Sequence, residues 1–189
     1  MIFTFSNLIN RVKEIILTPN SFWIKTKSEQ ENQTEIFTGF LIPLLIIVSA
    51  AVFLGEFFRS THFYMGFAIL KAIREMVLFL LQYFIAVYFT NTLMKTFGAE
   101  KNIQIARILV AYSLTPFFLV SIVTGLFQFL YAIDILGVYS FYIFWVGGRE
   151  LLVFPDQKRD SYLIITIVVN FFIFSFLSIM LSKLLEFYY

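Results

Sequence analysis

The chain alternates long uncharged segments with short polar ones. Four uncharged runs approach or exceed the roughly 20 residues that a helix needs to cross the hydrocarbon core of a bilayer. These runs are Ile36–Gly55, Met76–Met94, Ile108–Ile133 and Ser161–Ser182. The third run continues to Gly148 with only Asp134 as an interruption, and as one helix it would be about 60 Å long. Because that is twice the thickness of the core, we expect the chain to fold back near Tyr131–Gly137 and to form a fifth span.

The pattern therefore predicts an all-α integral membrane protein with a five-helix transmembrane bundle. We expect residues 36–189 to form this transmembrane domain, with spans at about 36–55, 76–94, 108–131, 135–153 and 161–182. Hydrophobic residues make up 60% of the 189-residue chain, which is too apolar for a water-soluble globule. The formal net charge of +2 gives no broad basic surface, so nothing indicates nucleic-acid binding.

Residues 1–35 form a separate region before the first span. Apolar side chains recur every three or four positions from Phe5 to Ile16, opposite polar ones, as in an amphipathic helix. We expect a helix over Phe3–Leu17 that ends before Pro19 and lies along the membrane interface, then Trp23 as an interface anchor and a polar linker over Lys25–Glu35. Two roles remain open for this helix: it presents its polar face to a partner, or it covers the cytoplasmic ends of its own bundle.

The distribution of Lys and Arg predicts the orientation. Ten of the 14 basic residues fall on the side that holds the N-terminus, and four fall on the other side. Since basic residues in short loops stay in the cytoplasm, we expect a cytoplasmic N-terminus and, after five crossings, Tyr189 outside. The loop Glu56–Glu75 is an exception with three basic residues, and we expect Lys71 to pair with Glu75 one helical turn later.

Three segments resemble the Yip family, the Ypt/Rab-interacting membrane proteins, and its short bacterial members in particular. They are Arg11–Trp23 (RVKEIILTPNSFW), Phe97–Pro116 (FGAEKNIQIARILVAYSLTP) and Gly137–Pro155 (GVYSFYIFWVGGRELLVFP). Ala99 stands where a second Gly is usual. The resemblance implies a five-helix bundle in the bacterial cytoplasmic membrane with a cytoplasmic N-terminus. Eukaryotic relatives bind Rab-type GTPases, but fold carries over between relatives better than function does.

The third expected span contains a predicted kink. Pro116 removes a backbone hydrogen bond, and the hydroxyl of Thr115 can bond a freed carbonyl. If the kink opens the bundle, Tyr112, Ser113 and Thr115 would line a cavity. If it does not, it is a bend that serves packing alone.

A compact polar loop between the second and third spans is the other candidate site. Glu100, Lys101 and Asn102 form this loop on the side that we assign to the cytoplasm. With Arg11 and Lys13 of the amphipathic helix, they are candidate contacts for a protein partner. The alternative is that Lys101 fixes the topology while Glu100 and Asn102 start the third helix.

The residues for common catalytic chemistry are missing. The chain has no Cys and one His, His62, so neither a thiol site, a two-His zinc motif nor a Ser-His-Asp triad can be built. No catalytic, metal or cofactor site is predicted. We expect a non-catalytic scaffold or adaptor in contact with membrane lipids and a protein partner at the cytoplasmic face, with no sequence support for a homo-oligomer. The alternative is a small permease or lipid-handling protein.

Overall fold

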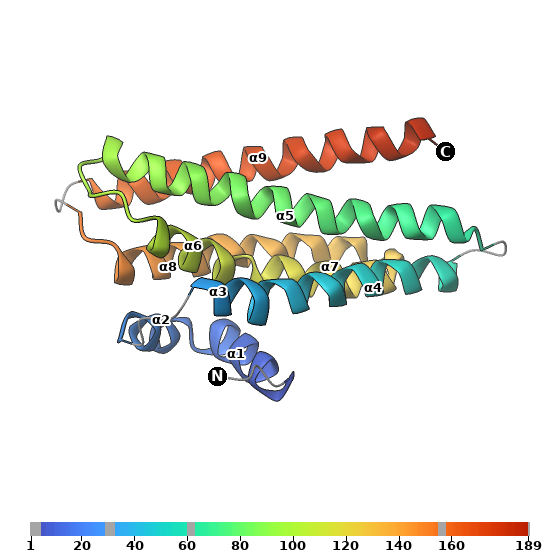
Figure 1. The fold of residues 1–189 in the computed structure, drawn as a ribbon, viewed down its shortest axis with the longest axis horizontal. Helices are drawn as coiled ribbons and strands as arrows, with labels where there is room; N and C mark the ends of the chain where they lie inside the picture. Colours follow the sequence, from blue (N-terminus) through green and yellow to red (C-terminus); the bar gives the residue numbers. More distant parts are fainter. Residues whose placement is uncertain (1–4, 29–32, 60–62, 155–157, 189) are drawn as a thin grey trace.

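The computed structural model describes residues 5–28, 33–59, 63–154 and 158–188. His62 therefore lies outside the described residues. Five helical segments are long and apolar enough to cross a membrane, and they form an elongated antiparallel bundle (Figure 1). These segments are Phe37–Phe58, Met65–Thr96, Ile103–Leu126, Gln128–Leu151 and Arg159–Phe187. The expected fold class, an all-α membrane protein with five spans, is confirmed.

The helices follow one another along the chain with short connections. In order they are α1 (Phe5–Leu17), α2 (Pro19–Ser28), α3 (Gln33–Ile36), η1 (Phe37–Leu41), α4 (Ile42–Arg59), α5 (Met65–Thr96), α6 (Ile103–Ser113), α7 (Thr115–Leu126), η2 (Gln128–Val138), α8 (Tyr139–Leu151) and α9 (Arg159–Tyr188). One end of the bundle carries the α5–α6 connection, and we call it the α5–α6 end. The other carries the C-terminus, and we call it the C-terminal end (Figure 1).

Two glycines let α4 and α7 pack closely near the C-terminal end. A Cβ atom added to Gly55 of α4 would lie 1.7 Å from the carbonyl oxygen of Gly125 in α7. A Cβ on Gly125 would in turn lie 2.8 Å from a side-chain carbon of Val52. Small residues at such a crossing allow two membrane helices to approach backbone to backbone. This contact fixes the first span against the third.

The fold-back between the third and fourth spans occurs earlier than Tyr131–Gly137, so the expected position was wrong. The helix α7 ends at Leu126, and Phe127 leaves helical geometry with φ −122° and ψ 79°. The 3₁₀ helix η2 then begins the fourth span, which runs antiparallel to the third. Gly137 is not a turn residue: it is buried at the end of η2, where a Cβ would meet the ring of Phe117 at 2.7 Å. A glycine is needed at this position because the ring of Phe117 packs directly against its backbone.

The helix of the second span, α5, starts at Met65, before the uncharged run that begins at Met76. It can start early because its charged residues are neutralised, but the partners differ from those expected. Lys71 pairs with Glu56 of α4 instead of Glu75, and Glu75 pairs with Arg74. The extra turns of α5 therefore carry ion pairs within the protein.

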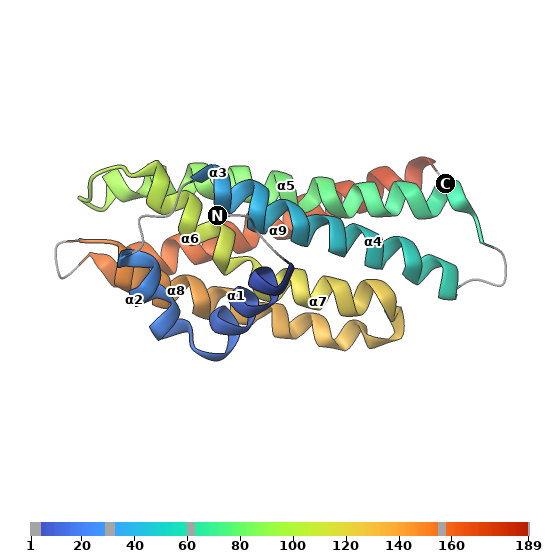
Figure 2. The same ribbon diagram turned by 60° about the horizontal axis from the view of Figure 1, so that its bottom comes forward.

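The N-terminal region is more helical than expected. A second helix, α2, runs through Lys25 to Ser28, where we expected a linker. Trp23 is fully buried and donates from its indole nitrogen to the carbonyl oxygen of Ile143, 3.1 Å away. It therefore packs inside the protein, and its expected role as an interface anchor was wrong. Figure 2 shows α2 in front of α8, and α1 in front of the junction between α6 and α7.

Candidate functional site

The third span is interrupted where α6 meets α7. Leu114 joins the two helices, and Pro116 lies in the first turn of α7, where a missing N–H leaves no bond unmade. The Thr115 hydroxyl donates to the carbonyl oxygen of Tyr112 at 2.7 Å. The N–H of Phe117 donates to the Ser140 hydroxyl of α8 at 3.2 Å. Side chains thus satisfy the backbone groups that the interruption frees, and the junction is tied to α8.

Tyr112, just before this junction, is the meeting point of the N-terminal region and the bundle. It is fully buried, and its ring contacts those of Phe22, Trp23 and Phe40 edge-on at centroid distances of 5.0, 6.0 and 4.8 Å. Arg11 of α1 donates from Nη1 to the Tyr112 hydroxyl at 2.6 Å. Its guanidinium carbon also lies 5.5 Å from the ring centre, within the range of a cation–π contact. Arg11, a candidate docking residue, is thereby joined to the kink.

Two further long-range bonds hold α1 and α2 on the bundle. The first is the bond from Trp23 to Ile143, and the second runs from the Tyr139 hydroxyl to the carbonyl oxygen of Ile16 at 3.0 Å. Gly147 of α8 makes room for the indole, because a Cβ there would lie 2.4 Å from a ring carbon of Trp23. The sequence signal that we missed is this glycine inside an apolar helix, which often marks a close approach of another group.

The polar loop at the α5–α6 end starts the third span. Asn102 is the N-cap of α6: its side-chain oxygen accepts from the N–H groups of Gln104 and Ile105, each at 3.0 Å. Glu100 and Lys101 are exposed, as is Lys13 on α1. Both ribbon views place α1 apart from the α5–α6 connection (Figures 1 and 2). The candidate docking residues therefore lie in two separate patches.

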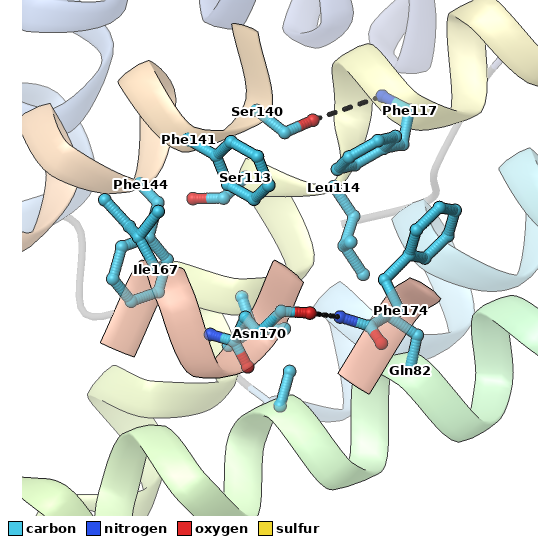
Figure 3. A pocket seen from close by; sticks show the side chains of 12 residues that line it. Gln82, Ser113, Leu114, Phe117, Ser140, Phe141, Phe144, Ile167, Asn170 and Phe174 are labelled. Carbon is cyan, nitrogen blue, oxygen red and sulfur yellow. Dashed lines mark hydrogen bonds between the residues drawn. The ribbon is translucent and has the colours of Figure 1, made fainter. Parts of the chain in front are cut away.

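A small cavity of about 30 Å³ lies beside the kink (Figure 3). Ser113 lines it, together with Gln82, Ser140 and Asn170, whereas Tyr112 and Thr115 are not among its lining residues. The amide nitrogen of Gln82 donates to the backbone carbonyl of Asn170 at 3.3 Å. Three buried side-chain oxygens, those of Gln82, Ser113 and Asn170, have no hydrogen-bond partner in the described protein. The cavity has the size and polarity for one water molecule.

A larger cluster of charged residues occupies the C-terminal end. Glu56 is 6% exposed and accepts hydrogen bonds from Lys71 and, at 2.6 Å, from the Gln128 amide. Arg74 donates to Glu75 at 2.6 Å and to the Ser182 hydroxyl of α9 at 2.6 Å. Sequence reasoning placed these charges at the membrane surface and missed that they join four elements. Among the described residues, no three His, Asp or Glu side chains are grouped so as to hold a metal ion.

Comparison with known families identifies a domain of membrane proteins in this chain. The Yip1 domain matches residues 13–177, which include the kink, the polar loop and most of the five spans. Comparison with curated proteins and with solved structures gives no match. Because the family match extends over most of the chain, this multi-pass membrane protein belongs to the Yip1 domain family.

Proposed function

We propose that this Yip1-domain protein is a non-catalytic membrane scaffold that binds a protein partner at its cytoplasmic face. The observation that carries the proposal is the fixed position of α1 and α2. The bonds from Arg11 to Tyr112, from Trp23 to Ile143 and from Tyr139 to Ile16 hold these helices on the bundle. A surface that is already ordered loses less entropy when a partner binds.

The charges on this ordered surface suit a partner of mixed charge. Lys13 is exposed, and beside it Glu14 and Lys25 form an exposed ion pair at 3.5 Å. Such rim charges steer association and fix its register more than they add affinity. Glu100 and Lys101 offer a second contact on the separate patch at the α5–α6 end. In this proposal Asn102 orders that loop, and Arg11 positions α1 instead of touching the partner.

Site-specific crosslinking in native membranes tests the proposal. A photoreactive residue at position 13 or 101 should give the same discrete protein adduct, because both positions face the partner. A photoreactive residue at position 183 is the control, since Lys183 is exposed on α9 toward the C-terminal end. The double variant Lys13→Glu/Lys101→Glu should weaken the adduct, whereas Lys183→Glu should leave it unchanged. Equal adducts from all three positions, or none from 13 and 101, would contradict the scaffold function.

The alternative permease function has less support at the kink. The cavity of about 30 Å³ beside Ser113 is far smaller than the roughly 300 Å³ or more of a typical small-molecule site. The rings of Phe117 and Phe174 stack at a centroid distance of 4.8 Å and border this cavity. A solute flux through the unaltered protein that is lost in the Ser113→Ala variant would instead support the permease function.

A further inference from the structure

A second cavity, of about 400 Å³, lies among the charged residues of the C-terminal end. Its lining includes two basic side chains, Lys71 and Arg74, and two acidic ones, Glu75 and Asp134. Phe117 and Phe174 border both this cavity and the small one beside the kink, so the aromatic stack separates the two. The larger cavity has the volume of a ligand site and a mixture of charges.

An apolar cleft adjoins this cavity on the side of α5 and α9. Its volume is about 270 Å³, and apart from Arg74 it is lined by aliphatic side chains. These are Leu70, Ile73, Val77, Leu181, Leu184 and Leu185. Arg74 borders both the cleft and the charged cavity. A polar compartment therefore meets an apolar one at a single guanidinium group.

The depth of these compartments corresponds to the edge of a membrane. The helix α5 has 32 residues and is about 48 Å long, so it exceeds a hydrocarbon core of about 30 Å by about 9 Å at each end. Counted from Met65, Lys71 and Arg74 lie about 9 and 14 Å along the helix. The charged cavity is therefore close to the boundary between headgroups and acyl chains.

We propose that the charged cavity and the apolar cleft together bind a phospholipid with a zwitterionic, amine-bearing headgroup. Lys71 and Arg74 contact the phosphate, Asp134 contacts the amine, and an acyl chain occupies the cleft between α5 and α9. This site lies at the other end of the bundle from the proposed partner surface and does not depend on it.

The hydrogen-bonding state of the three residues supports this assignment. An ammonium group has three donors, and the recorded bond from Lys71 to Glu56 uses one of them. The Nε atom of Arg74 is buried without a hydrogen-bond partner in the described protein. Asp134 is exposed and makes no ion pair with another described residue. Two side chains with unused donors, Lys71 and Arg74, and one with an unused acceptor, Asp134, thus line the same cavity.

Native mass spectrometry of the whole protein in mild detergent tests the site. The probes are phosphatidylethanolamine, phosphatidylglycerol, diacylglycerol and free phosphoethanolamine. We expect phosphatidylethanolamine to be retained at least about tenfold better than diacylglycerol, which lacks the charged groups. We also expect it to exceed phosphatidylglycerol, which lacks the amine, and free phosphoethanolamine, which lacks the chains.

Three variants assign the contacts. Arg74→Gln should reduce retention of both phospholipids, whereas Asp134→Asn, at an exposed position, should reduce retention of phosphatidylethanolamine alone, by about fivefold. Leu184→Trp, also at an exposed position, should fill the cleft and reduce phospholipid retention without affecting free phosphoethanolamine. Lys183→Gln is the matched control, because Lys183 lines neither compartment.

Two outcomes would overturn the proposal. One is equal retention of phosphatidylethanolamine, phosphatidylglycerol and diacylglycerol by the unaltered protein. The other is retention by Asp134→Asn and Leu184→Trp that matches the Lys183→Gln control. Both exposed variants are expected to stay folded, so the result does not depend on the stability of Arg74→Gln.

Discussion

Arg11 and Tyr112 lie 101 positions apart in the chain, yet the guanidinium of the first donates to the hydroxyl of the second at 2.6 Å. The bond joins the N-terminal helix to the interruption of the third span. It therefore links the position of α1 to the packing of the kink. The solvent accessibility of residues on α1 reports whether this bond is formed.

Replacing Tyr112 with Phe should loosen α1 while keeping the aromatic packing. The change removes a hydrogen bond to a charged group, which contributes about 1.5–3 kcal/mol. Because the chain has no Cys, a single cysteine can report the effect by its rate of thiol labelling. A cysteine at Leu8, which is 4% exposed, should react more than tenfold faster in the Tyr112→Phe background.

A cysteine at Ile9 provides the control for this measurement. Ile9 lies on the same helix and is 39% exposed, so its labelling should be fast with or without the Tyr112 hydroxyl. Unchanged protection of the cysteine at position 8 in the Tyr112→Phe protein would mean that the Arg11 bond does not hold α1 in place.

Gly55→Ala should destabilise the bundle through the crossing of α4 and α7. The new methyl group would lie 1.7 Å from a backbone oxygen of Gly125, so the two helices must move apart. Overpacking of this kind costs about 1–3 kcal/mol, which thermal unfolding in detergent can measure. Ala50→Val on the exposed side of α4 is the control and should change stability by less than about 0.5 kcal/mol. Equal melting of the two variants would argue against close packing at Gly55.

Lys71→Met should destabilise the protein more than a double change of the pair. The single variant removes the Lys71 cation from the buried carboxylate of Glu56, and breaking a buried ion pair in this way costs about 3–5 kcal/mol. The double variant Glu56→Gln/Lys71→Met removes both charges and should recover most of this loss, measured again by thermal unfolding. If the double variant were as unstable as the single one, the ion pair would not be the cause.

Reporter fusions test the orientation of the bundle. We expect reporters in the segments of Lys101 and Lys158 to be cytoplasmic and a reporter after Tyr189 to be external, because ten of the 14 basic residues lie on one side. A cytoplasmic C-terminal reporter together with a cytoplasmic Lys101 would be incompatible with five crossings.

The spans could be predicted from sequence because lipid imposes one simple requirement, a long uncharged helix. Structural features that depend on only a few neighbouring residues could also be predicted. The hydroxyl of Thr115 and the ring of Pro116 determine the junction of α6 and α7, and Asn102 is positioned to cap the next helix. In such cases the partner groups lie one turn away, so the sequence itself places them together.

Contacts between distant segments could not be predicted in this way. Lys71 has an acid one turn away in Glu75, but the structure pairs it with Glu56 on another helix. Near the fold-back at Phe127 the only turn-type residue is Gly125, which lies inside α7, whereas Asp134 and Gly137 together suggest a turn and lie beyond it. The corner follows directly after the residue where α7 crosses α4, Gly125, and such a crossing is a contact between two distant segments.

The ion pairs of α4 and α5 also bear on how the protein enters the membrane. In the expected orientation, the hairpin of these helices must carry Lys71 and Arg74 across the bilayer against the membrane potential. A lone cation would need about 2.3 kcal/mol of electrical work per 100 mV. Glu56 and Glu75 pair with these cations, so the four side chains together carry no net charge. In that orientation, a hairpin that inserts with both pairs formed carries only the charge of Arg59 across the bilayer, so the electrical work falls from that of three cations to that of one.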